Sequence, residues 1–90
     1  NNTSYFSQPI IKIHGQDNIK LFVNDKLVEI KQINEGIVID SEMQEAYYND
    51  NNMNHQMSGD FPIFEIGENK IRLEGNVNKI EILPNWRWLT

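Results

Sequence analysis

The residues of this chain best suited to acid–base chemistry are Asp40 and Glu42, which are separated only by Ser41. Glycoside hydrolysis uses two carboxylates about 5–9.5 Å apart on opposite sides of the scissile bond. Two positions apart on one strand, these side chains would project from the same face. The pattern favours a turn in which the side chains of Asp40 and Ser41 accept backbone N–H groups. We therefore predict no catalytic pair here.

The other groups that could hold a metal or attack a substrate are few. His14 and His55 are the two histidines, and neither has a second ligand at a recognised metal-binding spacing. Asp50-Asn51-Asn52 has the composition of a calcium loop, but Gly59 comes too late for the required turn. No serine lies in a Gly-x-Ser-x-Gly context, and there is no cysteine. We predict no catalytic residue, metal or cofactor, and expect that the chain is not an enzyme.

Aromatic residues are the remaining candidates for a binding surface. Trp86 and Trp88 would lie on one face of a strand, because side chains two apart point the same way. Such a platform could hold a sugar or a protein partner, but large aromatics also close small cores, and both interpretations stay open. The candidate contact residues are Tyr47, Tyr48, Trp86 and Trp88, with Phe61 and Phe64 as neighbours.

The elements that would position these residues are short β-strands. The chain has thirteen Ile, thirteen Asn and one Ala, a composition that favours strands joined by turns. Apolar or alternating runs predict strands at 9–13, 19–23, 26–31, 37–39, 44–48, 70–74 and 77–83, with an entering strand before residue 9 and a closing one at 86–89. Turn residues separate them at 14–17, 24–25, 34–36, 67–69 and 75–76.

Residues 49–59 contain four Asn and little apolar periodicity, which predicts a long, exposed and mobile loop.

Ile39 ends the most apolar strand and Ile71 begins the most regularly alternating one. Both isoleucines are expected to be buried in a common core. Short antiparallel strands with turns about every eight to twelve residues indicate an all-β fold, either a sandwich or a barrel. Of the two, we expect a two-sheet β-sandwich that occupies residues 1–90 as one domain.

The formal net charge of −5 argues against nucleic-acid binding, which needs converging basic residues. No apolar run approaches the roughly 20 residues of a membrane-spanning helix. The acidic charge and the lack of a helical seam predict that these ninety residues are monomeric in isolation.

Four stretches of the sequence together resemble the C-terminal domain of the distal tail proteins of long-tailed phages that infect Gram-positive bacteria. They are PIIKIHG at 9–15, IVIDSE at 37–42, FPIFEIGENKI at 61–71, and the run from Val77 to Trp88 that ends in PNWRW. Their order and spacing cover nearly the whole chain. The resemblance implies a galectin-like or jelly-roll β-sandwich in the baseplate at the tip of the virion's tail.

In that family a preceding domain forms a hexameric ring, and the C-terminal domain outside the ring carries other tail proteins. The resemblance therefore implies a structural attachment domain, encoded by a phage or prophage, as the C-terminal part of a longer homo-hexameric protein. Its expected partners are baseplate proteins, a receptor-binding protein among them. The alternative is a module that binds cell-wall carbohydrate, and a further alternative is an accessory domain of a cell-wall hydrolase.

Overall fold

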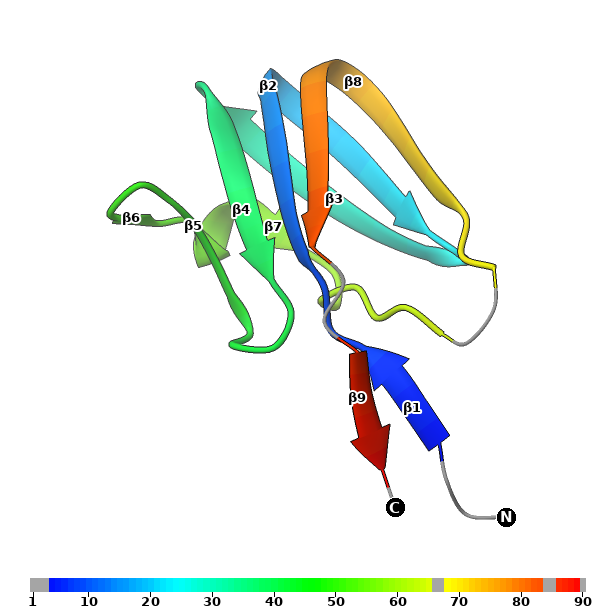
Figure 1. Ribbon diagram of the computed structural model, residues 1–90. Coiled ribbons are helices and arrows are strands. Elements are labelled where there is room, and N and C mark those ends of the chain that lie inside the picture. The colour runs from blue at the N-terminus through cyan, green and yellow to red at the C-terminus, as the bar shows by residue number, and fades with distance from the viewer. Residues whose placement is uncertain (1–3, 66–67, 84–85, 90) are drawn as a thin grey trace.

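The computed structural model describes residues 4–65, 68–83 and 86–89, which form a molecule built almost entirely of β-strands (Figure 1). The elements in chain order are β1 (Ser4–Ser7), β2 (Ile10–Val23), β3 (Lys26–Ile33), β4 (Gly36–Asp40), β5 (Glu45–Tyr48), β6 (Asn51–Asn52), the 3-10 turn η1 (Asn54–Gln56), β7 (Met57–Ser58), β8 (Ile71–Leu83) and β9 (Trp86–Leu89). Within the described ranges, no helix has the length and apolar character needed to cross a bilayer.

Strand β2 is the centre of a seven-stranded antiparallel sheet. Its first half pairs with β4 on one edge and with the second half of β8 on the other. Its second half pairs with β3 and with the first half of β8. Strands β5 and β6 continue the sheet beyond β4, and β7 continues it beyond β3. The sheet thus has two arms, a β4 arm and a β3 arm, joined through β2 and β8.

Both long strands bend where the two arms meet, so that the sheet curls on itself (Figure 1). The β2–β8 register shifts on either side of Gly15 and Gln16, which marks β-bulges, and bulges sharpen the local bend. A Cβ atom on Gly15 would clash with the backbone oxygen of Asn76, so only glycine fits there. Gly75 has a φ of +115°, which side-chain-bearing residues rarely adopt.

Because of this bend, two of the turns predicted from the sequence are absent from the structure. The sequence predicted chain reversals at 14–17 and 75–76, but β2 and β8 each run through these positions. Gly and Asn suit a bulge as well as a turn, because both tolerate positive φ. Sequence alternation breaks in the same way in both cases, so it could not distinguish them.

The core lies between the two arms and consists mainly of isoleucine. Ile39 is completely buried, as predicted. The β4 arm contributes Ile11, Ile13, Ile37 and Ile39, and the β3 arm contributes Ile19, Leu21, Val23, Val28, Ile30 and Ile33. Ala46, Met53 and Phe64 complete the same cluster. The curl therefore gives a single sheet two facing apolar surfaces.

The prediction that Ile71 is buried was wrong, because this residue is 37% exposed. It lies on β8, which within the described ranges pairs with β2 alone and so lines the open edge of the curl. The alternation of residues 70–74 was correctly recognised, but alternation does not report whether a strand is central or at an edge.

Residues 49–59 are largely exposed, as predicted, but the prediction of a long irregular loop was wrong. This segment forms β6, η1 and β7 and pairs with β5 and β3. Met53 is buried in the core, and its N–H donates to the carbonyl of Ala46 at 2.7 Å. The side-chain oxygen of Asn54 accepts the N–H of Ala46. Asn-rich composition here reflects side chains that satisfy backbone groups of a compact segment.

Other local predictions are confirmed. Asn24 and Asp25 form the turn of the β2–β3 hairpin, with Asn24 at a φ of +57°. Residues 44–48 return alongside β4 as β5. The all-β, antiparallel class is thus correct, but the hydrogen bonding of the main body forms one curled sheet and not two separate sheets. A galectin-like or jelly-roll arrangement is not confirmed.

The two ends of the chain form a separate two-stranded sheet, in which β1 pairs with β9 in antiparallel register. Figure 1 shows this ribbon projecting from one side of the curled sheet. The chain therefore enters and leaves the curled sheet at one place.

Candidate functional site

The aromatic platform predicted from the sequence is divided by the structure. On β5, Tyr47 lies opposite Val38, and Tyr48 is one position further along the strand. Neighbouring side chains on a strand point to opposite faces. Tyr48 packs against the core, whereas Tyr47 is on the outer face; both are half-buried. The two tyrosines cannot contact one flat ligand together.

Trp86 and Trp88 are on β9, which belongs to the β1–β9 ribbon and not to the curled sheet that carries β5. The side chains of these tryptophans lie outside the described residues. Of their predicted neighbours, Phe64 is 6% exposed and belongs to the core, which removes it from any surface platform.

Tyr48 does line a pocket, of about 270 Å³, and six of its nine other lining residues are Asn or Gln. We call this the Tyr48 pocket. Its lining residues are Gln32, Asn34, Glu35, Gly36, Tyr48, Asn49, Asn51, Asn52, Met53 and Gln56. They come from the β3–β4 turn on one side and from the segment that follows β5 on the other. The corrected fold of residues 49–59 is what builds the second wall.

Short contacts fix the shape of the Tyr48 pocket. The Gln56 amide donates to the carbonyls of Lys31 and Gln32, both at 2.9 Å, which ties η1 to the end of β3. A Cβ atom on Gly36 would lie 3.1 Å from the Tyr48 ring and 2.6 Å from a backbone oxygen. Glycine at this position therefore lets the ring lie directly against the turn.

The chemistry of the Tyr48 pocket suits a neutral, hydroxyl-rich ligand. An amide side chain donates and accepts at once, so it can pair with a hydroxyl in either orientation. Asn34, Asn49 and Asn51 are exposed. Glu35 is the one ionisable carboxylate among the lining residues, and Tyr48 supplies an aromatic surface. The arrangement offers hydrogen bonds and stacking but no acid–base pair.

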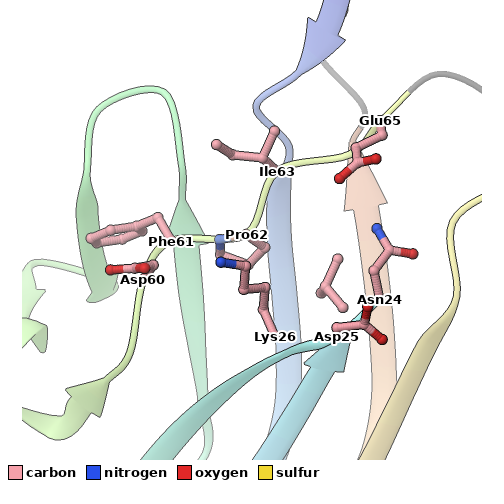
Figure 2. A pocket seen from close by; sticks show the side chains of 9 residues that line it. Asn24, Asp25, Lys26, Asp60, Phe61, Pro62, Ile63 and Glu65 are labelled. Carbon is pink, nitrogen blue, oxygen red and sulfur yellow. The ribbon is translucent and has the colours of Figure 1, made fainter.

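A second hollow, of about 290 Å³, lies between the β2–β3 hairpin and residues 60–65. Figure 2 shows this segment passing over the hairpin residues, with Asp60 beside Phe61 at one end and Glu65 near Asn24 at the other. We call this the Phe61 hollow. It is lined by Val23, Asn24, Asp25, Lys26, Asp60, Phe61, Pro62, Ile63 and Glu65. Ile63 is 49% exposed. The lining of the hollow thus combines apolar side chains with three carboxylates and one ammonium.

Asn69 and Asn24 hold the Phe61 hollow together. The Asn69 side chain accepts the N–H of Glu65 at 2.8 Å and donates to the carbonyl of Glu65 at 2.9 Å. Its oxygen also accepts the Asn24 amide at 3.1 Å. The backbone N–H and side-chain oxygen of Asn24 in turn bond Lys70, at 2.8 and 2.9 Å. A segment without regular strand structure is thereby fixed to the hairpin.

The remaining chemistry-bearing residues have local structural roles. Asp40 accepts the N–H of Met43 at 3.0 Å, which confirms the predicted turn. The Ser41 hydroxyl, also predicted to accept a backbone N–H, instead has no partner among the described residues. His14 lies 3.4 Å from Glu81 on the surface, and His55 is exposed in η1. Among the described residues, no three His, Asp or Glu side chains gather where a metal could bind.

Comparison with protein-family models, curated proteins and solved structures finds nothing that matches this chain.

Sequence reasoning therefore located one wall of one pocket. It identified Tyr48 but paired it with residues on another face and another sheet. It missed the amides of residues 49–56, because a polar, aperiodic run was interpreted as a loop. A usable signal was present, since Met53 is an isolated apolar residue within that run and a single buried anchor can fold a polar segment back.

Proposed function

We propose that this chain is a structural attachment domain at the tail tip of a phage, of the distal tail protein type. The proposal rests on the four sequence stretches that resemble that family. The β-rich fold is compatible with this proposal. As part of the proposal, the curled sheet belongs to the galectin-like class of β-sandwiches. The domain binds other proteins of the baseplate and carries out no reaction.

The structural observation that carries the proposal is the Phe61 hollow. Protein interfaces combine an apolar, well-packed centre with a polar rim, and a few anchors dominate the binding energy. Ile63 is a large apolar side chain left about half exposed, and four charged residues line the same hollow. Because Asn69 and Asn24 fix the segment, little conformational entropy is lost on binding.

The location at the tail tip is tested by electron microscopy of virions from the strain that encodes the chain. Antibodies raised against these ninety residues should label the end of the tail. Label on the capsid or along the tail tube, or virions without label, would contradict the proposal.

The contact at the Phe61 hollow is tested separately, with purified baseplate proteins of the same phage as probes. Ile63→Asp should weaken their binding to the immobilised chain by at least about tenfold, as loss of an interface anchor does. Leu27→Asp is the matched control, because Leu27 is 40% exposed on β3 and does not line the hollow. Equal losses in both variants would mean that the hollow is not the contact.

The second candidate function is carbohydrate binding, and the Tyr48 pocket favours it. Amides and an aromatic ring are the groups that bind sugar hydroxyls and sugar faces, and the pocket contains both. The ligand would be a neutral segment of a cell-wall polysaccharide. Such binding is compatible with attachment to a host surface.

Titration with purified wall polysaccharide, with dextran as an inert control, tests this candidate. Asn51→Ala and Tyr48→Ala should each weaken binding by about fivefold or more, the effect of losing one or two modest contacts. Tyr47→Ala makes a matched control on the opposite face of the same strand. If the wild-type chain binds neither polymer, the carbohydrate function is wrong and the attachment function is unaffected.

A further inference from the structure

Strand β8 presents a long edge on which, within residues 4–65, 68–83 and 86–89, no strand is paired. It is thirteen residues long. An edge strand exposes a row of N–H and C=O groups that can accept another strand. Soluble proteins usually shorten or cover such edges, so the composition of this one is informative.

The inner face of β8 is incompletely covered. Leu73, Val77, Ile80 and Ile82 pack against the core but are only partly buried, in contrast to the isoleucines of β2 beside them. Addition of one more strand along this edge would cover these side chains. Apolar burial would then add to the main-chain hydrogen bonds.

The outer face of β8 carries four charges in a self-complementary order. Arg72 and Glu74 lie before the bend, and Lys79 and Glu81 lie after it. When a second β8 is placed antiparallel, one register sets Arg72 opposite Glu81 of the second copy. The same register sets Glu74 opposite Lys79 of the second copy. By two-fold symmetry each of these pairs occurs twice.

The inner face matches in the same register. Ile71 falls opposite Ile82 of the second copy, and Leu73 falls opposite Ile80. Opposed residues in an antiparallel pair project from one face, so apolar meets apolar and charge meets opposite charge. The apolar and the charged pairs can form in one register because β8 has an extra residue at its bulge. The side chains that face inward are Ile71 and Leu73 before the bulge and Ile80 and Ile82 after it, so the numbering of the inward face changes from odd to even.

We propose that β8 pairs with β8 of a second copy of this chain, in this register, to form a symmetric dimer with a continuous curled sheet. Opposite charges already face each other between β2 and β8 within one chain, and the proposed pairing continues this pattern. Lys12 lies opposite Glu81, and Lys20 lies opposite Glu74. Across the new edge, the signs continue to alternate from β2 through β8 to the β8 of the second copy.

The dimer differs from the monomer expected from the net charge. That charge repels two copies as whole bodies, whereas the β8 edge provides local, register-specific attraction. We expect a dissociation constant on the order of 10–100 µM, typical of a small, weak interface.

Sedimentation velocity of this ninety-residue chain over a range of concentrations tests the pairing. Glu74→Lys puts like charges opposite each other twice per dimer and should raise the dissociation constant by about tenfold. Adding Lys79→Glu in the same chain reverses both partners and should restore the wild-type value. Glu45→Lys makes the same charge change on β5 and should not weaken the dimer.

Disulfide trapping tests the register, and the absence of cysteine gives a clean background. On mild oxidation, the double variant Arg72→Cys, Glu81→Cys should form a covalent dimer, since opposed Cβ atoms lie within disulfide range. The variant Glu74→Cys, Glu81→Cys places its cysteines out of register and should remain largely unlinked.

The inference is overturned if the wild-type chain remains monomeric at several hundred micromolar. It is also overturned if a dimer forms but is indifferent to Glu74→Lys, or if both cysteine variants crosslink equally. Monomeric wild-type chain that associates only with another baseplate protein would assign the edge to a different partner. None of these results bears on the Phe61 hollow or the Tyr48 pocket.

Discussion

At the scale of single residues, exposure depends on which strand a side chain occupies more than on its type. Ile39 and Ile71 have the same side chain and both lie on apolar strand positions, yet one is fully buried and the other is 37% exposed. Ile39 is on β4, which has paired strands on both edges. Ile71 is at the start of β8, at the open side of the curl.

This difference predicts unequal costs for truncation. Ile39→Ala should lower the free energy of unfolding by about 2–5 kcal/mol, because it removes buried atoms and leaves a cavity. Ile71→Ala should cost about 1 kcal/mol or less, since much of its surface already contacts water. Urea melts of the two variants measure both values, and equal costs would show that the core extends to the start of β8.

Ser41 allows a second prediction at this scale. Its hydroxyl is completely buried and has no hydrogen-bond partner within the described ranges, and its backbone N–H donates to Pro9 at 3.1 Å. A buried unpaired hydroxyl costs free energy that its removal recovers. Ser41→Ala should therefore leave stability unchanged or raise it by up to about 1 kcal/mol. A loss above about 1 kcal/mol in the same urea melts would reveal a partner for the hydroxyl.

At the scale of elements, the segment from β6 to β7 shows how polar sequence becomes ordered. It has one buried apolar side chain, Met53, and its asparagines bond the backbone around it. The segment also forms a wall of the Tyr48 pocket. Composition predicted a loop because it does not show which backbone groups the asparagines bond. The Asn52 side chain accepts the N–H of Asn54, and the Asn54 side chain accepts the N–H of Ala46 on β5.

Deletion of residues 51–54 tests the ordered segment. The deletion removes Met53 from the core and the Asn54 contact to Ala46, so we expect the melting temperature to fall by more than about 10 °C. A solvated loop would tolerate the same deletion with a change of a few degrees. Thermal melts followed by circular dichroism distinguish the two, and a small shift would restore the prediction from composition.

At the scale of the whole molecule, the two arms share β2 and β8 and one continuous core. The strands of each arm pair with a half of β2, so neither arm should unfold alone. The bend at Gly15 and Gly75 is what converts one sheet into two facing layers.

The shared strands predict a single cooperative transition. Ile30→Val in the β3 arm and Ile39→Val in the β4 arm should each cost about 0.5–1.5 kcal/mol and shift the same urea transition without changing its slope. Hydrogen exchange of the amides in both halves of β2 should report the same opening free energy. A transition that splits in either variant would show that the arms unfold independently.

The sequence by itself determined the strand class and most strand positions. Ile-rich alternation, as in residues 19–23, and turn pairs such as Asn24-Asp25 act locally, through side-chain packing on a pleated backbone and through positive φ at the turn. The burial of Ile39 also followed, because a short, wholly apolar run favours a central strand. These features depend on neighbours within a few residues.

Only the tertiary structure decided the rest. Whether Gly15 and Gly75 reverse the chain or bend it depends on which strand lies opposite, since a bulge is defined by its partner. Whether Ile71 is buried depends on how many strands flank β8. Which face of the sheet Tyr48 occupies, and so whether it lies beside the amides of the Tyr48 pocket, depends on the register of β5 against β4. Such long-range pairing leaves no mark in the local pattern of residues.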